Sequence, residues 1–157
     1  MNNQGLALHF STIINGEMIN IELSEADVHT FSAFAYSNGS EAGIPPVLAF
    51  KYPISCFIIA RECYIVLSPK SPAKAYDRKG NVLWCVNDII CRDDLDIMDG
   101  AIVTTEYIKD ANRSYYPELD KTLLSDEHEY ANLYSPSGHW FLLDITEKRL
   151  LTKGVSR

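Results

Sequence analysis

The fold of this chain is decided between residues 54 and 90, where the sequence reads Ile54-Ser55-Cys56-Phe57-Ile58-Ile59-Ala60, then Cys63-Tyr64-Ile65-Val66-Leu67 and, after a break that contains prolines, Val82-Leu83-Trp84-Cys85-Val86. Each run is short, rich in β-branched and aromatic residues and bounded by turn-forming residues, which is the pattern of β-strands. The first two runs are almost continuously apolar, so we expect both faces of those strands to be covered. Arg61-Glu62 between them is expected to form a two-residue turn.

Two elements are predicted before this stretch. Residues 6–23 predict a β-hairpin, because apolar residues alternate on both sides of Asn15-Gly16, and Asn-Gly suits the positive φ angles of a type I′ turn. Residues 25–37 predict a helix packed on the sheet. Ser24 followed by acidic residues is typical of a helix N-terminus, and an apolar stripe recurs at helical spacing between residues 28 and 35.

Residues 38–53 predict irregular structure with room for one helical turn after Pro46. Further along the chain the sequence predicts a strand at 101–107, a polar loop at 109–118 and a helix at 119–133. The last predicted element is a hairpin, with strands at 139–145 and 149–151 joined by a turn at 146–148. Strands dominate, so the predicted class is α+β: a mainly antiparallel β-sheet built from hairpins, with one or two helices packed on it. At 157 residues, the chain is expected to form a single globular domain over residues 1–157.

Two segments resemble each other, Tyr76 to Trp84 and Tyr134 to Leu142. Each has a tyrosine, a polar turn, a glycine four residues on and then an apolar strand. They are either a weak internal repeat or two hairpin tips that obey the same turn chemistry. The second interpretation is favoured, because repeat architectures need at least about three units.

The chain carries 14 basic and 21 acidic residues, a net charge of −7. Essentially all of the imbalance lies in one segment. Residues 92–131 hold 4 basic and 11 acidic residues, whereas residues 1–91 hold 6 basic and 8 acidic residues and residues 132–157 hold 4 basic and 2 acidic residues. An acidic surface repels phosphates, so direct binding to nucleic acid is not expected.

The sequence has neither a membrane-spanning segment nor a secretory signal, and this determines the expected compartment and the expected state of the cysteines. No run approaches the roughly 20 apolar residues of a membrane-spanning helix, and the first residues lack the basic and hydrophobic regions of a secretory signal. We therefore expect a cytoplasmic protein with no membrane association. In that compartment Cys56, Cys63, Cys85 and Cys91 are expected to be reduced thiols in or beside buried strands.

Motifs for catalysis, metal binding and cofactors are missing as well. The acidic run from Asp93 to Asp99 fails the spacing of an EF-hand calcium loop, and no two histidines stand at the helical spacing of metal ligands. There is no Gly-x-Ser-x-Gly and no phosphate-binding glycine motif. His139 is interpreted as a half-exposed strand residue in preference to a general base. We expect no cofactor and no metal, and we interpret the chain as a binding protein and not an enzyme.

The acidic segment also contains tyrosines, which offer large, rigid contact areas at protein interfaces. Carboxylates around such anchors would steer a basic partner into place. The predicted partner-binding residues are Asp93, Asp94, Asp96, Asp99, Tyr107, Tyr115, Tyr116, Asp126, Glu127 and Glu129. The plainer alternative is a solvated acidic face with no partner.

In size, acidity and lack of catalytic motifs the chain resembles small bacterial immunity proteins, which bind and block a cognate nuclease toxin. The resemblance is one of composition and spans the whole chain loosely. It implies a basic protein partner, namely a toxin nuclease domain, which the acidic, tyrosine-containing surface would neutralise.

Two other interpretations stay open. In one, the chain is a small enzyme or ligand-binding domain with an aromatic-lined pocket near the Trp84 and Trp140 hairpins, where a few polar groups converge. In the other, the chain is a subunit of an oligomer, and the apolar runs near Cys56 and Tyr64 form a shared sheet edge.

Overall fold

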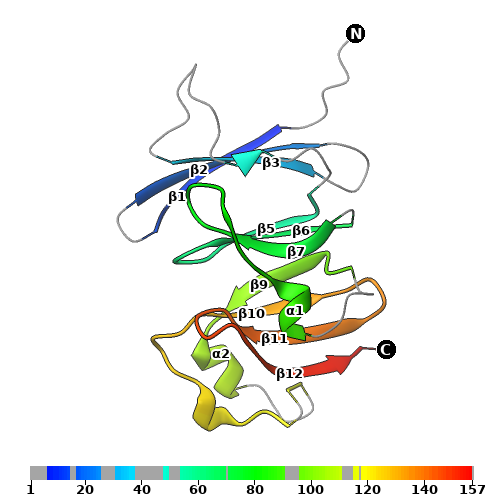
Figure 1. Cartoon of the computed structure of the whole chain (residues 1–157). Helices are drawn as coiled ribbons and strands as arrows, with labels where there is room; N and C mark the ends of the chain where they lie inside the picture. Colours follow the sequence, from blue (N-terminus) through cyan, green and yellow to red (C-terminus); the bar gives the residue numbers. More distant parts are fainter. Residues whose placement is uncertain are drawn as a thin grey trace.

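The computed structural model describes the backbone of residues 7–14, 17–25, 31–37 and 48–49, and both backbone and side chains of residues 54–69, 71–90, 96–110, 115–116 and 118–156. These residues form three four-stranded sheets, which follow one another in chain order from the top to the bottom of Figure 1. The first sheet consists of β1 (Ala7–Ile14), β2 (Glu17–Glu25), β3 (Phe31–Ser37) and β4 (Leu48–Ala49). The second consists of β5 (Cys56–Ile59), β6 (Tyr64–Ser68), β7 (Ser71–Tyr76) and β8 (Val82–Cys85). The third consists of β9 (Asp99–Val103), β10 (Tyr130–Tyr134), β11 (His139–Asp144) and β12 (Arg149–Val155).

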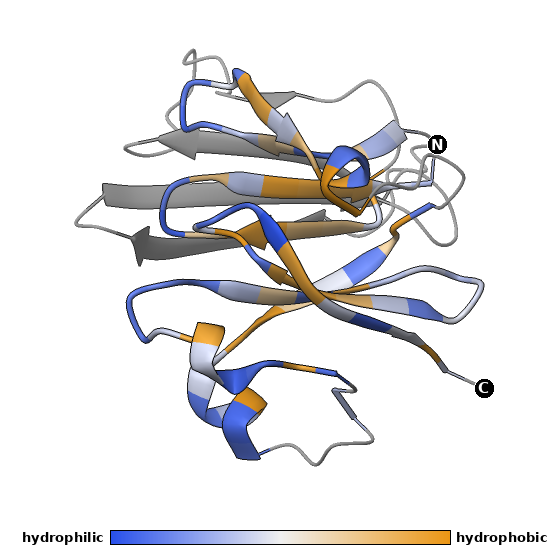
Figure 2. Ribbon diagram, turned by 60° about the horizontal axis from the view of Figure 1, so that its bottom comes forward, coloured by the Kyte–Doolittle hydropathy of each residue, from blue (hydrophilic) through white to orange (hydrophobic). Residues whose placement is uncertain are grey.

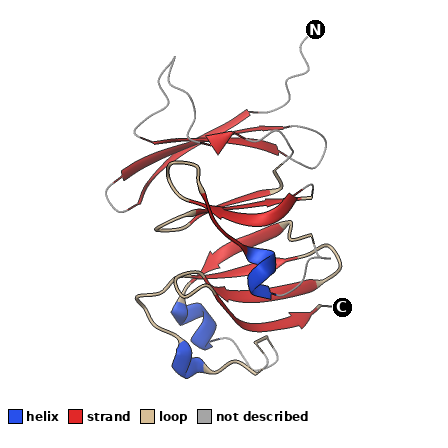
Figure 3. Ribbon diagram, in the orientation of Figure 1, coloured by secondary structure: helices blue, strands red, loops and turns tan. Residues whose placement is uncertain are grey.

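Each sheet is a simple meander, because strands that are consecutive in the chain and belong to the same sheet pair antiparallel. The described helices are short (Figure 3): α1 (Val86–Ile90), α2 (Thr105–Asp110) and the 3-10 turn η1 (Lys121–Leu123). The predicted class, α+β with mainly antiparallel sheet, is confirmed. None of the helices in the described part of the chain has the length and apolar character needed to cross a membrane.

The largest described core lies between the second and third sheets. Side chains alternate across a strand, so β10 turns Ala131 and Leu133 toward the second sheet, and β11 turns Phe141 and Leu143 the same way. Their partners from the second sheet and α1 are Ile58, Ile65, Leu67, Ala73, Ala75, Val86 and Ile90. In Figure 2 hydrophobic residues occur mainly within the strands of the second and third sheets, and hydrophilic residues are frequent at the turns.

β6 is buried along its whole length. Ile65 and Leu67 face the core shared with the third sheet, whereas Tyr64 and Val66 alternate to the other face and are only 0% and 2% exposed. The expectation that both faces are covered is therefore confirmed for β6, whereas in β5 only Ile58 is buried and the other three residues are half-buried. The predicted turn at residues 61–62 is also present, closed by a 2.9 Å hydrogen bond from the Ala60 amide to the Cys63 carbonyl oxygen.

The helix predicted at residues 25–37 is wrong. β2 continues to Glu25, and Phe31–Ser37 form β3, which pairs with β2 along its length; residues 26–30 lie outside the described residues. Aromatic residues favour strands as well as amphipathic helices, and the free edge of β2 offers backbone hydrogen bonds that sequence spacing cannot show. By contrast, the hairpin predicted at 6–23 is confirmed, since Ile14 pairs with Glu17. Asn15-Gly16 lies outside the described residues.

Other boundaries differ from the prediction. Leu48–Ala49 form β4 in place of a helical turn after Pro46. The strand expected at 101–107 ends at Val103 and α2 follows it, so the first two residues of the polar loop expected at 109–118 are helical. Residues 111–114 and 117 of that predicted loop lie outside the described residues. The helix expected at 119–133 is replaced by η1 and β10. The final hairpin is confirmed as β11 and β12.

β7 and α1 were not predicted at all. β7 begins Ser71-Pro72, and proline normally argues against a strand. It is tolerated here because the β6–β7 ladder is irregular between Val66 and Ser68, next to the proline. The apolar run that ends at Val86 continues into α1, so its last residue belongs to a helix.

The two similar segments occupy different places in the sheets. Tyr76 to Trp84 spans the turn between the third and fourth strands of the second sheet, whereas Tyr134 to Leu142 spans the turn between the second and third strands of the third sheet. Gly80 and Gly138 have φ angles of 92° and 91°, a backbone region that glycine enters without steric cost. The likeness therefore reflects shared turn chemistry, the interpretation that the sequence favoured.

Candidate partner-binding surface

Residues 104–129 connect β9 to β10 and are called the insertion below. The described residues of the insertion, 104–110, 115–116 and 118–129, lie on the side of the third sheet that faces away from the second sheet (Figures 1 and 2). Thr104 precedes α2, and its hydroxyl oxygen accepts a 3.1 Å hydrogen bond from the Tyr107 amide, which satisfies a free amide of the first turn. Ile108 on the inner side of α2 is fully buried against Tyr130 and Leu142 of the sheet.

A chain of aromatic rings runs from the outside of the insertion down to the sheet. Tyr107 and Tyr115 meet edge to face with ring centroids 6.2 Å apart, Tyr115 and Tyr116 are 4.9 Å apart, and Tyr116 and Trp140 of β11 are 5.9 Å apart. The outer rings of Tyr107 and Tyr115 are 47% and 45% exposed, whereas Tyr116 is only 4% exposed. Edge-to-face contacts stabilise beyond simple burial, so the two exposed rings are held on a packed base.

Hydrogen bonds fix the hydroxyl groups of this aromatic cluster. The Tyr116 hydroxyl accepts a 2.9 Å hydrogen bond from Asn132 Nδ2, and burial raises the pKa of Tyr116. A side-chain hydrogen bond with Tyr115 raises the pKa of Tyr107, and burial raises the pKa of Tyr134, which Tyr115 also contacts. At neutral pH these three phenols are therefore uncharged.

The insertion is strongly acidic, with seven acidic and three basic residues among positions 104–129. Its exposed carboxylates in the described residues are Glu106, Asp110, Glu118, Asp120, Asp126 and Glu127. Two of them have local roles. Hydrogen bonds from the side chain and amide of Thr122 lower the pKa of Asp120, which caps η1, and Asp126 accepts a hydrogen bond from the Thr105 hydroxyl.

The predicted partner-binding residues separate into two groups at opposite ends of the β9–β10 ladder. Asp99 pairs with Tyr134 at one end and Val103 pairs with Tyr130 at the other. Asp96 and Asp99 are exposed at the first end, where Tyr134 meets Tyr115. The acidic residues of positions 126–129 lead into Tyr130 at the second end. Asp93 and Asp94 lie outside the described residues.

Tyr116 and Glu129 differ from the other predicted residues because they are turned inward. Tyr116 supports the exposed rings from below, as described above. Glu129 has a side chain only 14% exposed and accepts a 2.8 Å hydrogen bond from the backbone amide of Arg61, in the turn between β5 and β6. Tyr116 thus supports the exposed rings, and Glu129 links the third sheet to the turn between β5 and β6.

Arg61 and Glu129 are the centre of a junction between the second and third sheets. The Arg61 guanidinium donates a 3.2 Å hydrogen bond to the Glu127 carbonyl oxygen. Arg78 Nη2 donates to the carbonyl oxygens of Ala60 and Arg61 at 2.6 and 2.9 Å. Sequence reasoning missed this junction because Arg61 and Glu129 are 68 residues apart, and no local pattern relates them.

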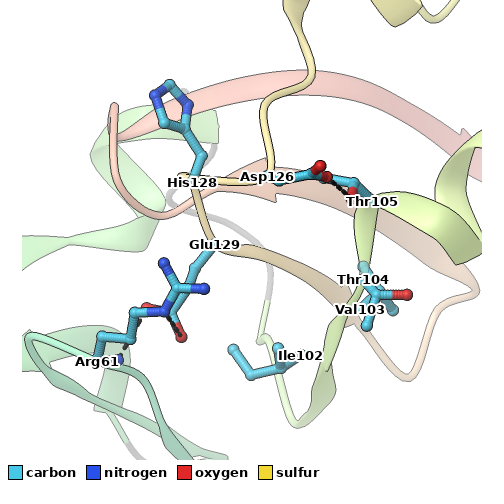
Figure 4. Close-up of a pocket in the computed structure, with 8 residues that line it drawn as sticks. All are labelled: Arg61, Ile102, Val103, Thr104, Thr105, Asp126, His128 and Glu129. Carbon is cyan, nitrogen blue, oxygen red and sulfur yellow. Dashed lines mark hydrogen bonds and ion pairs between the residues drawn. The ribbon is translucent and has the colours of Figure 1, made fainter. Parts of the chain in front are cut away.

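A cavity of about 250 Å³ opens at the junction (Figure 4). Its lining residues are Arg61, Ile102, Val103, Thr104, Thr105, Asp126, His128 and Glu129. Ligand pockets usually span roughly 300–1,000 Å³, so this cavity is small. Its two carboxylates are occupied, one by Arg61 and one by the Thr105 hydroxyl. The cavity is therefore a small space at the joint between the two sheets, and each of its two carboxylates accepts a hydrogen bond from within the chain.

The His128 ring points away from this cavity in Figure 4. Its Nδ1 lies 2.9 Å from Oδ2 of the fully buried Asp144, and its Nε2 lies 3.4 Å from Oε1 of Glu147. The imidazole thus ties the end of the insertion to the turn between β11 and β12.

The pocket proposed near Trp84 and Trp140 does not coincide with this cavity, which neither tryptophan lines. Trp84 packs on the core between the second and third sheets, whereas Trp140 packs on the opposite face of the third sheet. His139 Nδ1 lies 2.8 Å from the Ser137 hydroxyl within the turn between β10 and β11. The two hairpins therefore do not converge on one aromatic-lined site.

The shared sheet edge proposed near Cys56 and Tyr64 is not formed by Tyr64, because β6 is a central strand. Cys56 is on the edge strand β5, and its thiol donates a 3.4 Å hydrogen bond to the Gly100 carbonyl oxygen of β9. That edge consequently faces the third sheet of the same chain.

The described cysteines are free thiols: Cys56, Cys63 and Cys85. The expectation of reduced cysteines is confirmed for these three, and Cys91 lies outside the described residues. Burial raises the pKa of Cys63 to about 11, so this thiol stays protonated and a poor nucleophile at neutral pH. Within the described residues, no three His, Cys, Asp or Glu side chains are grouped as metal ligands.

Comparison with known proteins yields a likeness of fold alone. No protein-family model matches the chain, and no curated protein matches it. Two crystal structures of BBS1N in complex with ARL6DN, soaked with lead and with mercury, are similar to it, with TM-scores of 0.58 and 0.59 and 9% sequence identity. The two structural alignments cover 96% and 98% of this chain but only 39% and 40% of the BBS1N chain. The chain thus spans about two fifths of the length of BBS1N.

BBS1N is a β-propeller-containing protein. Propeller blades are four-stranded antiparallel sheets arranged around a common axis. The three consecutive meander sheets of this chain have that form, and contacts between β5 and β9 bring the first strands of neighbouring sheets together. The fold is thus similar to consecutive blades of a propeller.

Proposed function

We propose that this chain is a protein-binding module that recognises a basic protein partner through the outer side of the insertion and the adjacent end of β9. The observation that carries the proposal is the pair of exposed rings, Tyr107 and Tyr115, fixed edge to face on a buried aromatic base. Rigid aromatic anchors lose little conformational entropy on binding and are enriched among interface hot spots.

Charge gives this surface its preference for a cationic partner. Asp99 lies at the same end of the sheet as Tyr115, and Glu106 and Asp110 flank Tyr107 on α2. Carboxylates around aromatic anchors speed association with a basic protein and suppress acidic competitors. The fold is compatible with this role, since BBS1N, which has a similar arrangement of sheets, was crystallised in complex with another protein.

The narrower form of the proposal is neutralisation of a toxin nuclease domain, as in the immunity proteins that the chain resembles in composition. A nuclease presents a cationic surface to its phosphate substrate. A tyrosine-bearing acidic surface would cover that cationic surface and so block the enzyme.

Calorimetric titration with the product of the gene immediately beside its own tests this function. We expect binding that weakens as salt concentration rises, together with loss of that protein's nuclease activity. Tyr107→Ala should cost about 2 kcal/mol of binding free energy if Tyr107 is a hot spot, which is roughly a 30-fold loss of affinity. Asp99→Lys should weaken binding most at low salt, because ions screen exposed charges.

Glu62→Lys is the matched control, since Glu62 is an exposed acidic residue in the β5–β6 turn. That turn contacts residues 127 and 129, at the end of the β9–β10 ladder opposite to Asp99. Glu62→Lys makes the same change in net charge and should leave affinity nearly unchanged. Equal losses for Asp99→Lys and Glu62→Lys would show that only net charge matters and would contradict the proposed surface. Absence of binding to the neighbouring gene product would contradict the toxin partner.

A further inference from the structure

The third sheet has two apolar faces. Ala131, Leu133, Phe141 and Leu143 pack toward the second sheet. The alternate residues Tyr130 and Leu142, 1% and 0% exposed, are buried on the other face together with partly buried Trp140 and Leu151. In a stack of similar sheets, this second face is where the next sheet would pack, just as the third sheet packs on the second.

The insertion occupies that face. Ile108 of α2 and Tyr116 are buried there at 0% and 4% exposure, and Leu119 and Leu124 pack beside them. α2 is polar on its outer side, where Glu106 and Lys109 are exposed. Stacked repeat proteins need terminal units with one apolar inner side and one polar outer side for solubility. α2 has this distribution except for the half-exposed ring of Tyr107.

Polar contacts match the insertion to this particular face. The Ser125 amide donates a 2.7 Å hydrogen bond to the Tyr130 hydroxyl, and Asn132 Nδ2 donates to the Tyr116 hydroxyl at 2.9 Å. A further apolar sheet would leave the amide of Asn132, which is 4% exposed, without that partner, and an unpaired buried polar group is costly. The face is thus built to receive the insertion.

We infer that the described residues of the insertion, 104–110, 115–116 and 118–129, act as a capping strap that ends the stack of sheets at the third sheet. The strap takes the place of a further sheet, so no further sheet can pack on this face while the strap covers it. This role belongs to the inner side of the insertion and is independent of the binding function proposed for its outer side.

Ile108→Asp and Lys109→Asp test the inference as a matched pair, because they introduce the same side chain at neighbouring positions of α2, one buried and one exposed. We expect Ile108→Asp to detach the strap and expose the sheet. The variant should bind an apolar dye with several-fold higher fluorescence and sediment as a dimer or larger species, while its far-UV circular dichroism remains that of a β protein. Lys109→Asp should behave like the unmodified chain. A folded Ile108→Asp variant that neither binds dye nor self-associates would overturn the inference.

If Ile108→Asp does not fold, hydrogen exchange of the unmodified chain tests whether the insertion is a strap laid over the third sheet. A strap laid over a finished sheet should open locally, so amides of α2 should exchange at lower urea concentrations than amides of β10 and β11. Exchange of all three elements only at global unfolding would show that the insertion is an inseparable part of the sheet core and would overturn the inference. Neither experiment involves a partner protein, so failure of the proposed function would not affect it.

Discussion

At the scale of single residues, the aromatic base of the candidate surface depends on a glycine. Gly154 of β12 pairs with Trp140 of β11, and a Cβ atom at position 154 would lie 2.5–2.8 Å from three atoms of the indole ring. Those distances are shorter than van der Waals contact, so any other residue there would displace the indole. Trp140 in turn supports Tyr116, which supports the exposed Tyr115.

Gly154→Ala should therefore lower the free energy of unfolding by about 1–3 kcal/mol, the usual cost of overpacking, and should change the tryptophan fluorescence of the native state. Urea unfolding followed by fluorescence measures both effects. Val155→Ala, at the next position and 58% exposed in the native chain, is the control and should be nearly neutral. Equal stabilities of the two variants would contradict the close packing of Trp140 on Gly154.

At the scale of structural elements, the second and third sheets are joined by backbone and side-chain hydrogen bonds between two turns as well as by their core. The Arg61 amide is bonded to the Glu129 carboxylate, and the Arg61 guanidinium is bonded to the carbonyl oxygen of Glu127. These contacts place the start of β10 against the turn between β5 and β6. They also explain why Glu129, expected to contact a partner, is used within the chain.

Glu129→Ala should lower the free energy of unfolding by about 1 kcal/mol, because one hydrogen bond to a carboxylate is lost at a partly exposed site. Glu127→Ala is the matched control: Arg61 bonds the backbone oxygen of residue 127, which the substitution retains. Urea midpoints measured at unchanged m-value compare the two variants. A larger loss for Glu127→Ala than for Glu129→Ala would contradict the junction as described.

The same scale shows where sequence reasoning succeeded and where it failed. Strands with strong local signals were predicted correctly, including β5, β6, β8, β11 and the hairpin of β1 and β2. β3 was mistaken for a helix because its aromatic residues also fit helical spacing, and β7 was missed because of Pro72. In both cases the decision came from a neighbouring strand edge, which supplied hydrogen bonds or allowed an irregular ladder.

At the scale of the whole molecule, the second and third sheets share one hydrophobic core and should unfold as one unit. Leu133 is fully buried at its centre, so Leu133→Ala should cost about 2–5 kcal/mol, as large-to-small core substitutions do. Far-UV circular dichroism and tryptophan fluorescence should report the same lowered urea midpoint. Leu123→Ala in η1, where Leu123 is 39% exposed, should change stability by less than about 0.5 kcal/mol. Separate midpoints for the two probes would contradict a shared core.

The sequence by itself determined the local features of this protein: the runs that become strands, the turns, and an acidic segment that contains tyrosines. These follow from residue properties that act over a few positions, such as side-chain alternation and glycine conformation. The tertiary structure alone decided that twelve described strands form three meander sheets, that Tyr107, Tyr115, Tyr116 and Trp140 meet, and that the acidic residues divide between two ends of one ladder. The physical reason is that strand pairing, burial and charge proximity depend on contacts between residues far apart in the chain, which no local pattern encodes.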